Sequence, residues 1–165
     1  SETARHRSRV SSSHPLLSQT AILGQNINVS DYDVIYAGAQ KNMGIAGLAV
    51  TIIKKDLIGK IDDPSVPIML QYKPFFENNS MYNTPPCWSI YMAGLMFKWV
   101  KNMGGVEEME KRNIQKSSLL YDAIDNSKIF SNPVRKDDRS IMNVTFTLPN
   151  EEDTKAFLEL VKKPN

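Results

Sequence analysis

Lys41 is the residue of this sequence whose surroundings most favour chemistry. It lies in a run of small and polar residues, Gly38-Ala39-Gln40-Lys41-Asn42, between two apolar segments, 34–37 and 48–53. Both segments are short and rich in β-branched residues, so we expect two buried strands joined by a turn that carries the lysine. A lysine there is expected to lie close to the core and to be partly desolvated. Desolvation favours the nucleophilic free amine that Schiff-base chemistry with a carbonyl cofactor requires. From spacing alone, a surface lysine in a turn is the alternative.

Other reactive side chains offer less. Cys87 is a single cysteine, which excludes an internal disulfide framework and a cysteine-based zinc site. We expect it to be a small buried residue rather than a nucleophile, because both histidines lie far away near the N-terminus. His6 and His14 are eight residues apart without a nearby aspartate or thiol, which is a poor arrangement for a metal ion. No metal site is predicted.

The composition is that of a soluble, intracellular, globular protein, and we expect a cytoplasmic location. The 165 residues are 41% apolar and 23% charged, enough for one or two small units with a core. The net charge of +2 gives no polybasic field, so nucleic acid is not a predicted partner. No apolar run approaches the roughly 20 residues that span a bilayer, so no membrane partner is predicted either.

Residues 1–27 differ from the rest of the chain. They carry three arginines, several serines and a single acidic residue, Glu2. A basic, serine-rich and acid-poor start is typical of an organelle transit peptide, but the arginines define no amphipathic helix with a clear apolar face. We therefore expect a flexible arm, or a segment that is not native to the domain that follows.

Further elements follow from periodicity. Residues 87–102 are apolar with few polar positions, which predicts a helix buried on several sides, in the core or at a subunit interface. Gly104-Gly105 ends this helix, and a second helix is expected from near Val106 to about Ile124. Residues 141–148 alternate apolar and polar side chains and predict a half-buried strand, and a helix is expected over 151–161.

The segment Tyr36-Ala37-Gly38-Ala39-Gln40-Lys41-Asn42 resembles the pyridoxal-phosphate lysine motif of the phosphoserine aminotransferases. Further segments occur in the order and spacing of that family, and the resemblance covers about residues 28–160. These segments are Pro64-Ser65-Val66, Tyr72-Lys73, Asn78-Asn79-Ser80-Met81-Tyr82-Asn83-Thr84-Pro85-Pro86, Trp99-Val100-Lys101-Asn102-Met103-Gly104-Gly105, Met109-Glu110-Lys111, Ile124-Asp125-Asn126-Ser127 and Arg139-Ser140-Ile141-Met142-Asn143-Val144.

The resemblance implies an α/β fold class, as part of a fold-type I transferase that depends on pyridoxal 5′-phosphate. On this basis residues 1–27 are the atypical arm. Residues 28–104 belong to the large cofactor-binding domain, with part of its sheet and an interface helix. Residues 105–165 are a linker helix and the beginning of the small α+β domain.

The resemblance also implies roles for individual residues. Lys41 is the catalytic residue, which binds pyridoxal 5′-phosphate covalently and then moves a proton on the bound amino acid. Gln40 helps to hold the cofactor phosphate. Asn83 and Thr84 reach the phosphate of the neighbouring subunit's cofactor in a homodimer, since an amide and a hydroxyl can donate hydrogen bonds to phosphate without a permanent charge. The implied reaction converts 3-phosphohydroxypyruvate and glutamate to phosphoserine and 2-oxoglutarate, in serine biosynthesis.

The sequence departs from the family in length and in one position. Members are more than twice as long, so we expect a fragment that lacks the upstream cofactor contacts and the downstream arginines that bind substrate. Leu17 stands where the family motif Ala-Asp-Met-Ser-Ser carries the acid that pairs with the ring nitrogen, and a leucine cannot accept that hydrogen bond. One alternative is a non-catalytic truncated relative that binds a full-length subunit. Another is a related fold-type I transaminase with a different substrate, against which Asn83-Thr84-Pro85-Pro86 and the motif order argue.

Overall fold

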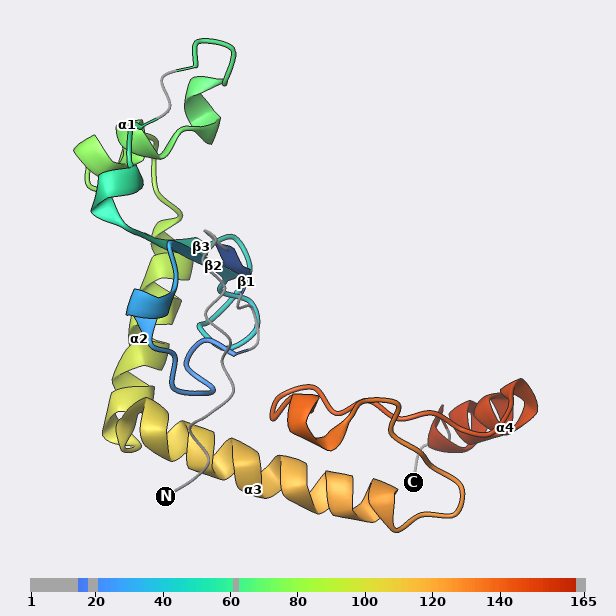
Figure 1. Ribbon diagram of the computed structural model, residues 1–165. Helices are drawn as coiled ribbons and strands as arrows, with labels where there is room; N and C mark the ends of the chain where they lie inside the picture. The colour runs from blue at the N-terminus through green and yellow to red at the C-terminus, as the bar shows by residue number, and fades with distance from the viewer. Residues whose placement is uncertain (1–14, 18–20, 61–62, 163–165) are drawn as a thin grey trace. The chain divides into compact units, whose positions relative to one another are not determined.

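The computed structural model describes residues 15–17, 21–60 and 63–162, and Figure 1 draws its helices and strands coloured from blue to red along the chain. The chain divides into two compact units. The first comprises residues up to 19 together with 27–95, and the second comprises 20–26 together with 96–165. The predicted arm lies mostly outside the described residues, and the predicted domain boundaries at 27 and 104 remain predictions.

A small mixed sheet forms the centre of the first unit. Strands β1 (Pro15–Leu17), β2 (Val34–Gly38) and β3 (Ala49–Ile53) lie in that order, with β1 parallel and β3 antiparallel to β2 (Figure 1). Both strands predicted around Lys41 are therefore confirmed. The predicted burial is seen in β2, where Ile35 and Ala37 are buried. It is not seen in β3, which is largely exposed among the described residues. The reason is that β3 is an edge strand, which no described element covers.

Helix α2 (Cys87–Asn102) has the predicted bounds. In the described chain Ser89, Ala93 and Val100 are buried while larger side chains are exposed, so the helix is not buried on several sides within this chain, and its place at a subunit interface remains a prediction. Trp88 and Tyr91 stack on each other at 5.8 Å between ring centroids, yet 66% and 57% of their surfaces remain exposed. Cys87 at the start of the helix is exposed, so the expectation of a buried thiol is wrong. Cys87 precedes the buried Ser89 by two residues, about half a turn, so it lies on the other side of the helix from the small-residue face that packs.

Short helical segments connect these elements. A short helix α1 (Tyr72–Glu77) precedes α2, and single 3₁₀ turns lie at Val29–Asp31, Lys55–Leu57, Ile68–Leu70 and Lys136–Asp138. Among the residues that the structure describes, no helix is long and apolar enough to cross a membrane.

Helix α3 (Gly105–Asp125) begins within one residue of its predicted start. Gly104 and Gly105 have φ angles of 104° and 80°, a backbone region that other residues rarely adopt, so the pair separates α3 from α2. Within the second unit, the Asn113 side-chain amide donates to the Gly24 carbonyl at 2.8 Å and fixes the segment 21–26 against α3.

The helix predicted over 151–161 is confirmed as α4 (Glu151–Lys162). Its apolar contact is formed by three phenylalanine rings. Phe130, Phe146 and Phe157 meet edge to face, with ring centroids 5.3–6.1 Å apart. The strand predicted over 141–148 is wrong, since Thr147 makes an isolated bridge with Ser131. The alternating pattern is present, but no neighbouring strand among the described residues extends the ladder that a strand needs.

An ion-pair cluster joins the end of α3 to the following loop. Arg139 donates to both carboxylate oxygens of Asp125, at 2.7 and 2.8 Å, and Lys136 lies 3.4 Å from the same carboxylate. The Arg139 guanidinium also lies 4.7 Å from the centre of the Tyr121 ring. Hydrogen bonding from Arg139 is the main reason that the pKa of Asp125 falls to about 2.

We predict that Asp125→Asn destabilises the chain at neutral pH and that this effect disappears in acid. The folded-state pKa of Asp125 lies below its unfolded value of about 4. The stabilisation is therefore fully present above about pH 4 and is lost as the pH falls toward about 2. Urea unfolding from pH 7 to pH 2 measures it, with Asp122→Asn on the same helix as a control expected to match the original chain. A deficit that stays constant over this pH range would contradict the prediction.

Candidate cofactor site

The turn between β2 and β3 is closed by its own backbone. The Ala39 N–H donates to the Leu48 carbonyl at 2.9 Å, which continues the β2–β3 ladder by one pair. The Ala39 carbonyl accepts hydrogen bonds from the N–H groups of Met43 and Gly44, at 3.1 and 2.8 Å. Residues 40–42 therefore project from a closed turn whose two ends are fixed.

Burial divides the turn into an inner and an outer side. Ala39 and Met43 are 0% and 1% exposed, whereas Gln40 and Lys41 are exposed. The expectation that Lys41 lies close to the core is therefore wrong, because Ala39 and Met43 take the inward positions, and the alternative of a surface lysine in a turn is confirmed. In the part of the chain that the structure describes, no hydrogen bond or ion pair holds the Lys41 amine. Its nitrogen is accessible for a covalent bond.

Gln40 uses space that Gly38 leaves open. A Cβ atom at Gly38 would lie 2.9 Å from Nε2 and 3.0 Å from Cδ of the Gln40 side chain. The glycine therefore allows the carboxamide to lie back over the end of β2. An amide donor and an exposed lysine on adjacent residues are groups that suit the phosphate and the aldehyde of pyridoxal phosphate.

The turn packs on the small residues of α2. The Ser89 hydroxyl donates to the Ala46 carbonyl at 3.0 Å. A Cβ atom at Gly44 would lie 3.3 Å from the backbone nitrogen of Ala93, and one at Gly47 would lie 3.2 Å from the Ser89 Oγ. The glycines thus permit a close approach that larger residues would obstruct.

Asn83 and Thr84 lie on exposed backbone before α2. The Asn83 side-chain amide donates to the Met69 sulfur at 3.8 Å. Over the described ranges, no hydrogen bond or ion pair joins either residue to Gln40 or Lys41. Their expected role, toward the cofactor of a neighbouring subunit, remains a prediction.

Leu17 ends β1, directly beside β2. Its backbone pairs with Tyr36 in the parallel register, so the ends of β1 and β2 face the same edge of the sheet as the lysine turn. Ligands of α/β proteins commonly bind at the carboxyl ends of strands. The following residues, Ser18-Gln19-Thr20, lie outside the described residues, and the role inferred for position 17 remains a prediction.

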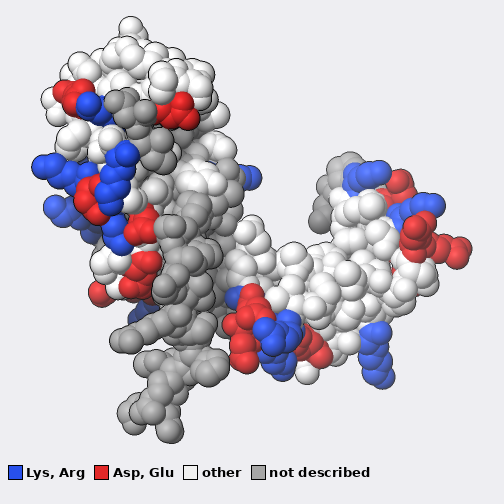
Figure 2. All heavy atoms as spheres, turned by 45° about the horizontal axis from the view of Figure 1, so that its top comes forward, with Lys and Arg blue, Asp and Glu red and all other residues white. Residues whose placement is uncertain are grey.

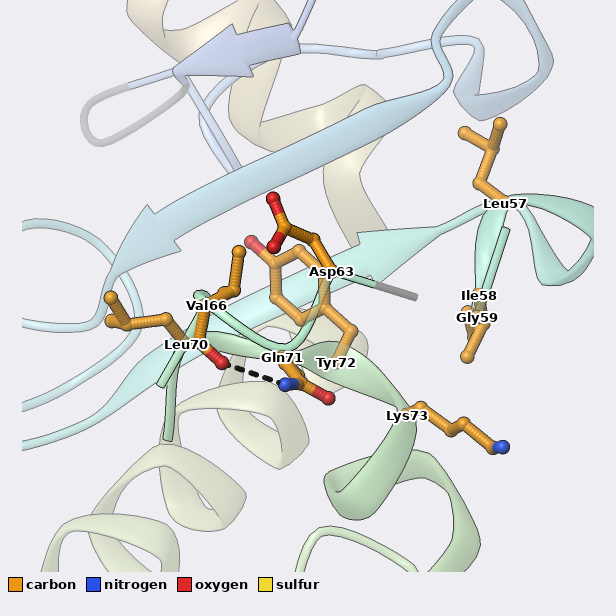
Figure 3. A pocket seen from close by; sticks show the side chains of 9 residues that line it. All are labelled: Leu57, Ile58, Gly59, Asp63, Val66, Leu70, Gln71, Tyr72 and Lys73. Atoms are coloured by element: carbon orange, nitrogen blue, oxygen red, sulfur yellow. Dashed lines mark hydrogen bonds between the residues drawn. The ribbon is translucent and has the colours of Figure 1, made fainter. Parts of the chain in front are cut away.

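Sequence reasoning missed a cavity of about 280 Å³ around the segment 57–73 (Figure 3). Asp63, Tyr72 and Lys73 contribute its polar side chains, and the Gln71 amide donates to the Val66 carbonyl at 2.8 Å. Hydrogen bonds from Ser65 hold the pKa of the Asp63 carboxyl below its usual range. None of the predicted site residues lines this cavity. The residues that line it follow no regular spacing in the sequence by which the cavity could have been predicted.

The charged side chains on the face drawn in Figure 2 indicate no further binding site. Figure 2 shows acidic and basic side chains interspersed over the face drawn, without a field of one sign. The described residues also contain no group of three or more histidine, cysteine or acidic side chains that could hold a metal ion.

Comparison with known proteins is consistent with this geometry. Residues 18–161 match the family model for class-V aminotransferases. The chain is 51% identical over 142 residues to a phosphoserine aminotransferase of Bacillus cereus, and 50% identical over 139 residues to that of Lactococcus lactis. These matches cover 86% and 84% of this chain but only 39% and 38% of the relatives. The chain therefore spans about two fifths of their length.

Solved structures give the same result. The phosphoserine aminotransferase of Bacillus circulans subsp. alkalophilus superposes with a TM-score of 0.85 at 38% identity, over 92% of this chain and 42% of that one. A pyridoxal-phosphate-bound phosphoserine aminotransferase from Trichomonas vaginalis gives 0.87 at 32% identity, over 96% and 46%. The mostly helical chain with its small sheet is thus a piece of this fold, and the expected fold class is confirmed to that extent.

We predict opposite effects from two glycine substitutions in the first unit. Gly47→Ala should destabilise the turn by about 1–2 kcal/mol, because Gly47 has a φ of 97° and its new Cβ would crowd Ser89. Gly94→Ala, inside α2 with no atom within 4 Å of the added Cβ, should stabilise by about 0.5–1 kcal/mol. Denaturant unfolding measures both, and equal effects of the two substitutions would contradict the described packing.

Proposed function

Because this chain belongs to the class-V aminotransferases, we propose that it carries the lysine-bearing part of a phosphoserine aminotransferase. The reaction moves the amino group of glutamate to 3-phosphohydroxypyruvate and yields phosphoserine and 2-oxoglutarate. The observation that carries the proposal is the closed turn 39–48, which leaves Lys41 accessible in a chain 51% identical to such an enzyme.

Lys41 is the residue to which the chemistry is assigned. When bound, pyridoxal phosphate supplies an aldehyde and an electron-withdrawing ring. The Lys41 Nζ atom would hold the cofactor covalently, and after substrate displaced it the free amine would move the proton at the substrate α-carbon. Both tasks need the same amine to stay near the same reacting atoms. The turn that carries Lys41 has both of its ends fixed by backbone hydrogen bonds, which keeps the lysine in one position.

Other residues would bind rather than react. Gln40, the residue before Lys41, would donate its side-chain N–H to a phosphate oxygen. Asn83 and Thr84 would donate to the phosphate held by a second subunit of a homodimer. Leu17 offers no acceptor for the ring nitrogen at the aligned position, so the pull of the ring on electrons would be weakened there.

A second candidate function is favoured by the exposed side of α2. Trp88, Tyr91 and Leu95 lie along one side of the helix and are all exposed. An apolar side of this kind suits a non-catalytic relative that binds a full-length aminotransferase subunit.

Binding to a full-length subunit is tested by mixing. We predict that the chain co-purifies with the full-length Bacillus cereus enzyme and that Trp88→Ser with Tyr91→Ser weakens this association at least about tenfold, because two aromatic contacts are lost. The matched control is Leu119→Ser with Leu160→Ser, which changes exposed apolar residues on α3 and α4. A chain that stays monomeric beside the full-length enzyme would rule out this alternative.

The main proposal is tested by trapping. We predict that incubation with pyridoxal 5′-phosphate, followed by borohydride reduction and peptide mass spectrometry, labels Lys41 in preference to other lysines. The reason is that its neighbour Gln40 can hold the phosphate while the Lys41 amine reacts. In the Lys41→Ala chain, the labelling that remains should be the low background level expected at exposed lysines such as Lys98 and Lys101. Labelling spread evenly over the lysines of the original chain would refute the assignment of Lys41.

A further inference from the structure

Ser89 is a buried polar side chain on a helix whose neighbouring positions are apolar. It is 7% exposed, and its hydroxyl donates to the carbonyl of Ala46, 43 residues earlier in the chain. A serine inside a helix usually bonds back to a carbonyl of the preceding turn of that helix. Ser89 instead bonds the turn that carries Lys41.

Ser117 shows the usual arrangement within the same chain. It is 6% exposed on α3, and its hydroxyl donates to the Ile114 carbonyl of its own helix at 3.1 Å. The two serines match in burial and in having a bonded hydroxyl. They differ in what the hydrogen bond holds, which is a separate segment for Ser89 and the local helix for Ser117.

The Ala46 carbonyl lies in the second half of the turn, between Gly44 and Gly47. We call residues 44–47 the returning limb of the turn. Gly44 approaches the α2 backbone at Ala93, and its N–H donates to the Ala39 carbonyl. A shift of the returning limb would therefore move the Gly44 N–H, whose hydrogen bond to the Ala39 carbonyl closes the turn. Lys41 lies between Ala39 and Met43, which are the two residues joined by that closure.

We propose that Ser89 is a positioning residue for Lys41. Its hydroxyl fixes the returning limb of the turn on α2 and thereby sets where the Lys41 amine is presented. The proposal rests on the proposed function only in taking Lys41 as the cofactor lysine. The anchoring of the turn by Ser89 can be measured without the cofactor.

The test compares Ser89→Ala with Ser117→Ala in the full chain. Alanine is the better helix former, so neither substitution should weaken its helix. Pyridoxal 5′-phosphate with borohydride reduction gives the ratio of labelling at Lys41 to labelling at Lys101. Ser89→Ala should lower this ratio at least about threefold, the effect of one hydrogen bond between uncharged groups. Ser117→Ala should leave it unchanged, and Ser89→Thr, which keeps the hydroxyl, should restore it at least in part.

Amide hydrogen exchange is the second readout and needs no cofactor. Ser89→Ala should speed exchange at the N–H groups of Met43 and Gly44 without speeding it in α3. Unchanged exchange there, an equal loss of labelling with Ser117→Ala, or a Ser89→Thr chain no better than Ser89→Ala would each overturn the proposal. Even labelling of the original chain would instead remove the cofactor role of Lys41, and the exchange data would still decide whether Ser89 anchors the turn.

Discussion

The carbonyl group of Ala39 is the point on which the lysine turn depends. It accepts two backbone hydrogen bonds from the returning residues while its own N–H pairs with Leu48, so one residue closes both the turn and the strand ladder. A larger side chain at this position would have to displace its neighbours, because Ala39 is completely buried. Small residues in the sequence thus give a tight turn, the tight turn directs Ala39 and Met43 inward, and Gln40 and Lys41 are left accessible.

Regular elements follow from the sequence where periodicity is strong. Helix α2 has the predicted bounds, α3 begins one residue early, and the strands around Lys41 occur where β-branched residues gather. The segment 141–148 shows the limit of this reasoning. Its alternation is as clear as that of a strand, but a strand also needs a neighbour, and in the described chain its one ladder contact is the bridge between Thr147 and Ser131. Pattern predicts which residues can pair, and the pairing itself depends on distant segments.

The site is less predictable than the elements, for a related reason. Lys41 could be singled out from the small residues before it, but the sequence allowed both a lysine near the core and a surface lysine, and the choice depends on Ala39 and Met43 taking the inward positions. Ser89 appears in the sequence as an interruption of an apolar helix, and its bond to Ala46 spans 43 residues. Residues that react can be found by type and spacing, whereas residues that position them are revealed by contacts. The exposed side of α2 is likewise revealed by the structure and not by the apolar pattern, which does not tell an exposed side from a buried one.

The central claim is that this chain holds the reactive lysine of a phosphoserine aminotransferase. The most direct measurement replaces the matching part of the Bacillus cereus enzyme with residues 18–161 of this chain and follows phosphoserine formation from 3-phosphohydroxypyruvate and glutamate. The account predicts glutamate-dependent transfer by the chimera and its loss in the same chimera with Lys41→Ala. A folded chimera that binds pyridoxal phosphate but transfers no amino group, or one whose rate is unaffected by Lys41→Ala, would contradict it.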